Sequence, residues 1–178
     1  MSEFREMRRK RQQLSNEESV GILQKSTSGT LALLGDNGYP YVVPISYVYS
    51  DGKLYFHSAP CGHKIDAIRN CDKASFCVID ADDVKPKEYT TYYRSVVVFG
   101  RISIIEDETE KMAAARLLSE RYNPNDEEGF RKEIEKGFAR MLAFRFDIEH
   151  LTGKEAIELV RLHNGINIDE TPQIHNNN

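Results

Sequence analysis

The chain has 178 residues, of which 40% are apolar and 29% charged, and its formal net charge at pH 7 is -4. This length suits one domain with its own core, and the slight acidity gives no electrostatic argument for a nucleic-acid partner. No apolar run approaches the length of a membrane span, and the basic start "MSEFREMRRKRQQ" lacks the apolar stretch of a secretory signal. Cys61, Cys71 and Cys77 have no framework spacing, so we expect free thiols and a cytoplasmic protein.

The first half of the chain predicts a helix followed by a meander of three strands. Ser15 and Glu18 have the spacing of a capping box, which marks the helix start. Two turn signals, "GDNG" and "SDG", separate three short apolar runs. The predicted strands cover residues 30–34, 41–49 and 53–58.

The second half alternates further strands with helices. Strands are predicted at 73–80, 94–107 and 140–156, and helices at 62–70, 107–124 and 126–138, the last being the more polar. Residues 80–93 are predicted to form a polar loop. Hairpin turns between neighbouring strands indicate a largely antiparallel sheet, closed or half-closed into a barrel. We expect one domain over residues 1–163 and a flexible tail over 164–178.

Two strands carry signals of irregularity. Pro40 and Pro44 cannot donate hydrogen bonds to a ladder, so their strand should lie at a sheet edge or be bulged. Gly100 lies inside the strand 94–107 and indicates a bulge or kink.

The segment "HSAPCGHK" is the densest cluster of reactive side chains in the sequence. His57, Cys61 and His63 could ligate a metal, but a structural zinc site needs a fourth ligand and Lys64 would repel a cation. Cys61 and His63 could form a nucleophile and its base, but no orienting acid is evident. We therefore predict no metal site and give these two interpretations less weight.

An anion-binding turn accounts for this segment better. A strand ends near Ser58, a helix begins near His63, and the first amides of a helix are unpaired donors at the positive end of its dipole. Gly62 lets the backbone approach a ligand closely, and Lys64 adds a positive charge. From spacing alone, an ordinary solvated turn remains an equal alternative.

Three ordered stretches, "YPYVVPISYVY", "KLYFHSAPCGHKIDAIRN" and "RSVVVFGRI", resemble the flavin-binding split-barrel superfamily that includes pyridoxamine 5'-phosphate oxidase. Within it, the sequence resembles the nitroimidazole-resistance proteins. The resemblance implies a mainly β fold, a six-stranded antiparallel split barrel with flanking helices. It also implies a homodimer with FMN bound at the interface.

The resemblance also implies which residues hold the cofactor. The FMN phosphate would be held by His57, Ser58, Gly62, His63 and Lys64. The flavin ring would lie along Val43, Pro44, Ile45 and Ser46, and Arg94 and Ser95 would approach it from the long later strand. His63 stands where the oxidase has an arginine, so this contact is expected to depend on pH.

The chain departs from pyridoxamine phosphate oxidase at its C-terminus. That enzyme's substrate signature carries tryptophan and arginines, whereas this chain has no tryptophan and ends "NGINIDETPQIHNNN". We therefore do not expect oxidation of vitamin B6.

The expected activity is FMN-dependent reduction of a small acceptor, such as a nitro-aromatic, with NADH or NADPH as candidate donor and His57 as candidate proton donor. The alternative is a non-catalytic protein of the same fold that binds flavin, or haem through His57, His63 or His150. No nucleic-acid or membrane partner is expected. Sequence alone does not separate an enzyme from a binding protein.

Overall fold

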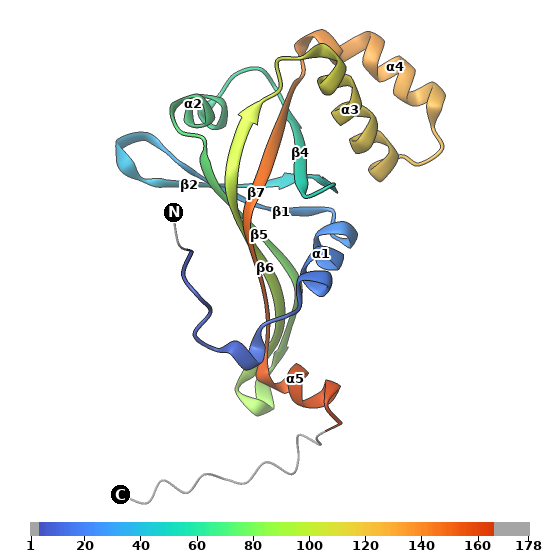
Figure 1. The fold of residues 1–178 in the computed structure, drawn as a ribbon. Helices are drawn as coiled ribbons and strands as arrows, with labels where there is room; N and C mark the ends of the chain where they lie inside the picture. Colours follow the sequence, from blue (N-terminus) through green and yellow to red (C-terminus); the bar gives the residue numbers. More distant parts are fainter. Residues whose placement is uncertain (1–3, 166–178) are drawn as a thin grey trace, which may run out of the picture.

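A computed structural model describes residues 4–165 and shows one seven-stranded antiparallel sheet with helices at its ends and along one side (Figure 1). The strands are β1 (Ser28–Leu34), β2 (Pro40–Ser46), β3 (Val48–Ser50), β4 (Lys53–Ser58), β5 (Lys73–Lys85), β6 (Thr90–Ile104) and β7 (Leu142–Glu155). The helices are α1 (Asn16–Lys25), α2 (His63–Asn70), α3 (Glu108–Tyr122), α4 (Glu127–Gly137) and α5 (Ile157–His163). Short 3-10 turns lie at η1 (Lys10–Gln12), η2 (Asp36–Gly38), η3 (Pro86–Glu88) and η4 (Phe138–Arg140).

The strand order across the sheet is β2-β1-β5-β6-β7-β4-β3, so β2 and β3 are its two edge strands. Only Tyr47 separates these strands in the chain, so the two edges meet there and the sheet curls into a half-open barrel. The mainly β fold class is therefore confirmed. The predicted strand 41–49 is in fact two strands, which makes seven strands rather than six.

The break between β2 and β3 has a tertiary cause. The Tyr47 side chain is fully buried, and its hydroxyl donates to the Leu23 carbonyl at 2.7 Å. The Tyr122 hydroxyl accepts a hydrogen bond from the Tyr47 amide at 2.9 Å. The corner therefore depends on residues from α1 and α3 that are distant in sequence.

Both predicted strand irregularities are confirmed. β2 lies at a sheet edge, as Pro40 and Pro44 require. The pairing register between β6 and β7 shifts at Phe99 and Gly100, and a Cβ at Gly100 would collide with the Asp147 carbonyl. Glycine is therefore required at this bulge by close backbone approach.

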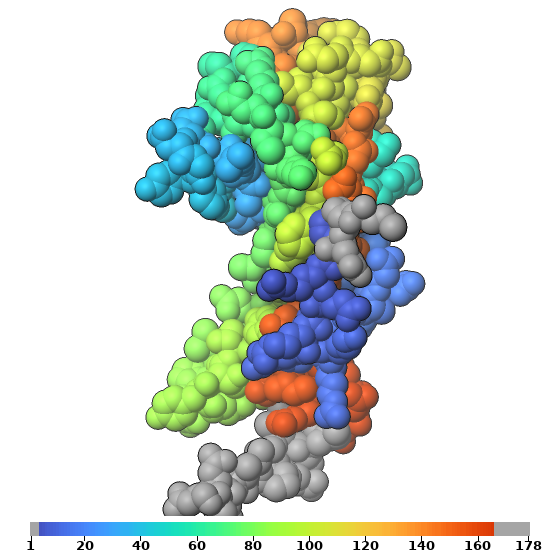
Figure 2. Space-filling view, turned by 60° about the vertical axis from the view of Figure 1, so that its left-hand side comes forward, coloured from blue at the N-terminus to red at the C-terminus, as the bar shows by residue number. Residues whose placement is uncertain are grey.

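The polar loop predicted at 80–93 is wrong. β5 and β6 continue through most of this segment, with Asp83 paired to Tyr92 and Lys85 to Thr90, and η3 makes the turn. This hairpin extends past the core, and its side chains are mostly polar although its two strands remain paired. Figure 2 shows the β1–β2 and β5–β6 hairpins projecting from the same side of the elongated molecule, with a recess between them.

The core lies inside the curled sheet and is rich in aromatic rings. Tyr47 packs edge-on against Phe76 with ring centroids 4.9 Å apart, and Phe56 packs on Phe76 at 5.4 Å. The predicted capping box of α1 is confirmed, because the Glu18 amide donates to the Ser15 hydroxyl at 3.1 Å and the Ser15 amide donates back to Glu18.

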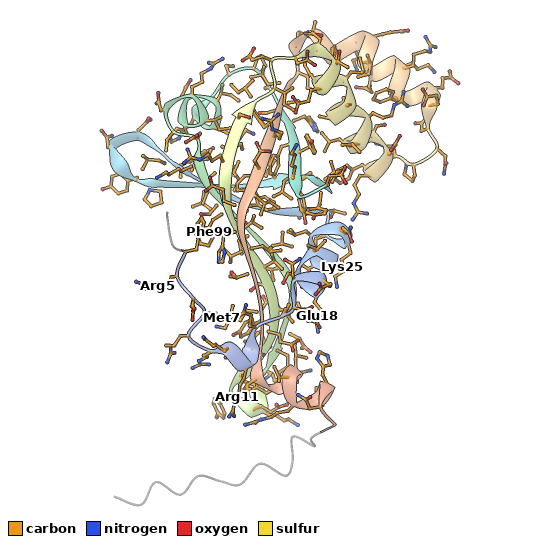
Figure 3. The ribbon with its side chains drawn as sticks, viewed as in Figure 1. Arg5, Met7, Arg11, Glu18, Lys25 and Phe99 are labelled. Carbon is orange, nitrogen blue, oxygen red and sulfur yellow. The ribbon has the colours of Figure 1, made fainter. Side chains whose placement is uncertain are left out.

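The N-terminal segment runs along the outside of the sheet (Figure 3). Phe4 stacks on His150 at 4.7 Å and contacts Phe99 at 5.7 Å, so this segment covers part of β6 and β7. Within residues 4–165, no helix has the length and hydropathy that crossing a membrane requires. Most of the predicted tail, residues 166–178, lies outside the described residues.

Candidate functional site

The turn between β4 and α2 presents free backbone donors. Gly62 is the N-cap of α2, with φ 118°, a region that side chains other than glycine's rarely adopt. No side chain caps the helix, so the first amides of α2, those of His63 and Lys64, remain able to donate to a ligand. This geometry suits an anion.

Lys64 adds a positive charge beside this turn. Its side chain is half-buried, and burial holds the pKa of its ammonium below the usual value. No carboxylate of the described residues lies within ion-pair distance of Lys64. A cation that is partly removed from water without a counter-charge is stabilised by an anionic ligand.

The His63 ring contacts residues of the β1–β2 hairpin and its turn. The ring stacks on Tyr41 with centroids 4.1 Å apart, and Nε2 lies 3.6 Å from the Asp36 carboxylate. The imidazole therefore rests against the β1–β2 hairpin, while the His63 amide stays at the helix start.

His57 and Ser46 approach the same cavity from different strands. Burial, and then the charge of Lys64, lower the pKa of the His57 imidazole below its ordinary value of 6.5. The ring retains contact with solvent, yet it is mainly neutral at pH 7 and can donate or accept a hydrogen bond. Ser46 lines the same cavity as His57, which shows that barrel closure brings the end of β2 to the end of β4.

The four predicted β2 residues alternate between two faces. Val43 and Ile45 pack against the core, whereas Pro44 and Ser46 are exposed on the outer face. Packing therefore accounts for Val43 and Ile45, while Pro44, Ser46 and the edge backbone of β2 remain accessible to a ligand.

Arg94 and Ser95 lie apart from the other predicted residues. On β7, Ala143 pairs with His57 and Glu155 pairs with Arg94. These two positions are separated by roughly 40 Å along the strand. The Arg94 guanidinium lies 3.1 Å from Glu155 and 3.9 Å from Asp80, and both carboxylates are almost fully buried. Arg94 is thus engaged within its own chain.

A cavity of about 710 Å³ lies between the barrel end and the α3–α4 helical hairpin. Besides Ser46 and His57, its walls include residues that the sequence did not single out: Leu118, Tyr122, Phe130, Ile134, Phe138 and Met141. One signal in the sequence was available. Phe130, Ile134 and Phe138 recur every four residues on an otherwise charged segment, which is the spacing of one helix face. Among the described residues, no three His, Cys, Asp or Glu side chains are grouped as a metal site.

Three examples represent the solved structures that are similar to this fold. A FAD-binding protein from Mesorhizobium loti is 30% identical, covers 81% of this chain and 96% of its own, and has a TM-score of 0.60. A Bacteroides thetaiotaomicron protein named for 5-nitroimidazole antibiotic resistance is 20% identical over 80% of this chain and 86% of its own, with a TM-score of 0.71. A FAD and haem binding protein from Mycobacterium smegmatis is 24% identical over 82% of this chain and 73% of its own, with a TM-score of 0.70.

The family comparison covers most of the chain. Residues 15–155 match the model of a family described as pyridoxamine 5'-phosphate oxidase. This range runs from the cap of α1 to the end of β7 and so includes the whole sheet. The chain therefore belongs to the pyridoxamine 5'-phosphate oxidase family.

Proposed function

We propose that this chain is a flavin-dependent oxidoreductase that binds FMN and reduces a small acceptor. The observation that carries the proposal is the half-buried Lys64, which no carboxylate of the described residues pairs with, beside the uncapped start of α2. FMN has a phosphate dianion, a ribityl chain and a flat ring. The amides at the start of α2 would bind the phosphate, and the accessible edge of β2 would pack against the ring.

The described residues fit this cofactor. Ser58, Gly62, His63 and Lys64 would hold the phosphate, chiefly through amides and the Lys64 ammonium. Pro44 and Ser46, with the β2 backbone, would line the ring. Bound flavin supplies the electron or hydride transfer, and the protein supplies binding and orientation.

The phosphate end of this site is open to solvent. Cys61, Gly62 and His63 are all exposed, so the nucleotide that FAD adds to the phosphate would also have room. The FAD-binding relative makes this distinction worth measuring. Chromatography of the released cofactor decides between the two flavins.

His57 is our candidate proton donor to the reaction. Its imidazole lies at the cavity wall and is mainly neutral at pH 7, so it carries an N–H that can be donated. The acceptor we propose is a nitro-aromatic or similar small molecule, with NADH or NADPH as the donor. The fold shared with the nitroimidazole-resistance structure supports this choice by resemblance alone.

A homodimer is the assembly we propose. One row across the outer sheet face contains Val42, Ala32, Ser75 and Phe99, and both Val42 and Phe99 are exposed. Ile79 is 68% exposed on the same face. An exposed apolar face beside a recess fits a second copy, which would bring its Arg94 and Ser95 toward the flavin of the first.

The first test is a visible absorption spectrum of the protein purified without added cofactor. Two broad flavin bands, followed by release of FMN on denaturation, support the proposal. Reduction by NADH or NADPH and reoxidation by an added nitro-aromatic would then separate an enzyme from a carrier. A Soret band would instead assign His57, His63 or His150 to haem, and a colourless protein that takes up no FMN would overturn the proposal.

A further inference from the structure

The cavity between the barrel end and the α3–α4 hairpin has features that flavin binding does not use. Its volume of about 710 Å³ falls within the usual range of small-molecule sites. Its walls extend from Ser46 and His57 to α4, so it begins at the proposed flavin site and continues beyond it.

α4 presents an apolar face to this cavity instead of to the core. Phe130 and Ile134, and Phe138 just after the helix, follow each other at intervals of four residues and all line the cavity. Each of the three is half-buried, and α4 contains no fully buried residue. On the facing wall, Leu118 and Met141 add further apolar surface. This face of α4 is therefore left with free apolar surface that a ligand would cover.

α4 is fixed in place at its N-terminal end by Arg116 of α3 and by its own cap. The Arg116 guanidinium lies 3.8 Å from the centre of the Phe130 ring and forms an ion pair with Glu127. Asp126 caps the helix by accepting a hydrogen bond from the Gly129 amide at 2.9 Å. These contacts hold the apolar stripe over the cavity without filling it.

The charges around the cavity argue against an anionic ligand. Lys132 is the one cation among the lining residues, and it is paired with Glu128 at 2.6 Å. Glu133 and Asp126 place two carboxylates on the same walls. His57, at the flavin end, is mainly neutral at pH 7. Mostly apolar walls, with two carboxylates, a lysine already paired within the chain and a neutral His57, favour an uncharged ligand.

We propose that this cavity binds a flat, uncharged aromatic molecule, and that α4 is its specificity-determining wall. The inference rests on the proposed function, because it assigns to the acceptor a binding site and a chemical class. Phe130 and Ile134 cover the ring of the ligand, and His57 hydrogen-bonds to a polar group on its edge. A substrate carrying a phosphate or sulfonate is excluded by the carboxylates of the walls.

Binding of two matched probes to the full chain tests this inference without any redox step. The probes are 2-naphthol and naphthalene-2-sulfonate, which share a ring system and differ in charge, and the dissociation constants are measured by fluorescence titration at pH 7. We expect 2-naphthol to bind more tightly to the unmodified protein. Ile134→Ala should weaken 2-naphthol about tenfold, since one aliphatic side chain no longer covers the ring.

Ile134→Lys tests a quantity that a purely structural role of Ile134 would leave unchanged, namely the preference between the two probes. Ile134 is half-exposed, so a lysine is tolerated there, and its charge should reverse the preference toward naphthalene-2-sulfonate. Glu135→Gln is the matched control, because Glu135 is the next residue of the helix, is exposed and does not line the cavity. It should leave both dissociation constants unchanged.

FMN titration of the same variants separates this inference from the proposed function. Unchanged probe preference in Ile134→Lys, or equal effects of Ile134→Ala and Glu135→Gln, overturns the cavity assignment even when FMN binds. Ile134-dependent binding of 2-naphthol by a protein that takes up no FMN leaves the cavity site standing and removes the flavin proposal.

Discussion

The two ends of the sheet differ in whether their charged groups are paired. At the end formed by the β5–β6 hairpin and α5, Arg94 pairs with both Asp80 and Glu155, and Lys25 lies 2.6 Å from Asp80. In this cluster the Nε of Arg94 is the one buried polar atom without a partner among the described residues. At the end formed by β4 and α2, no carboxylate of residues 4–165 pairs with Lys64, and the helix has no side-chain cap.

This difference is the basis on which we propose the end of the sheet that binds a ligand. A buried charge is tolerated when an opposite charge within the chain compensates it, as at Arg94. A half-buried charge without such a partner raises the free energy of the unliganded state, and an anion relieves that cost. We therefore propose that Arg94 stabilises its own chain, in addition to its proposed approach to the flavin across the dimer, and that Lys64 binds the ligand.

The largest effect is expected from breaking the paired end. Arg94→Met removes the guanidinium that pairs with two nearly buried carboxylates and leaves Asp80 with Lys25 alone, so it should lower the free energy of unfolding by about 3 kcal/mol. Urea denaturation followed by circular dichroism measures this change. Arg101→Met is the matched control on the same strand, because Arg101 is half exposed, and its loss should cost under about 1 kcal/mol. Equal losses in the two variants would contradict the structural role of Arg94.

At the open end, Lys64→Ala should change binding and leave folding intact. Removing a charge-assisted phosphate contact should raise the dissociation constant for FMN by roughly 10- to 150-fold, which corresponds to about 1.5–3 kcal/mol. Quenching of FMN fluorescence measures it. Arg69→Ala, at the other end of α2, is the control and should bind FMN as the unmodified protein does. Unchanged affinity in Lys64→Ala would mean that the phosphate lies elsewhere.

The same lysine predicts a pH dependence of flavin binding. Burial lowers its pKa from 10.5, so Lys64 loses its proton at a lower pH than a free lysine does. Affinity for FMN should therefore be highest at neutral pH and fall as the pH rises toward 10.5. Lys64→Arg should bind with a flatter profile, because arginine stays charged over this range. If Lys64→Ala shows the same slope as the unmodified protein, another group causes the dependence.

Local signals predicted the parts of the fold that depend on neighbouring residues. The capping box at Ser15, the turns at 35–38 and 50–52, and the edge position of the proline-containing strand all follow from short-range chemistry. The hairpin at 80–93 was missed because its pairing is backbone to backbone and its side chains are mostly polar. The usual strand signal is an alternation of apolar and polar residues, which arises where one face of the strand packs on the core. This segment lies beyond the core.

The candidate site likewise combines local features that the sequence predicts with tertiary contacts that it does not. The turn at Gly62 and the helix start at His63 are local and were visible in the sequence. The approach of Ser46 to His57 depends on barrel closure, and the stacking of His63 on Tyr41 depends on how α2 packs against the β1–β2 hairpin. Such contacts carry no sequence signature. The α4 stripe had one, but many charged residues surround it.

The smallest effect we expect comes from the residue that joins the barrel corner to the cavity. Tyr122 accepts a hydrogen bond from the Tyr47 amide, and its hydroxyl lies 2.7 Å from the Tyr47 carbonyl. Tyr122→Phe keeps the ring in the cavity wall and removes these bonds, so unfolding should become easier by about 1 kcal/mol. The Tyr47 amide also reaches the Thr27 carbonyl at 3.4 Å, which limits the loss. Urea denaturation checks this value, and a loss near that of Arg94→Met would show that the corner, and not the paired end, dominates the stability of the barrel.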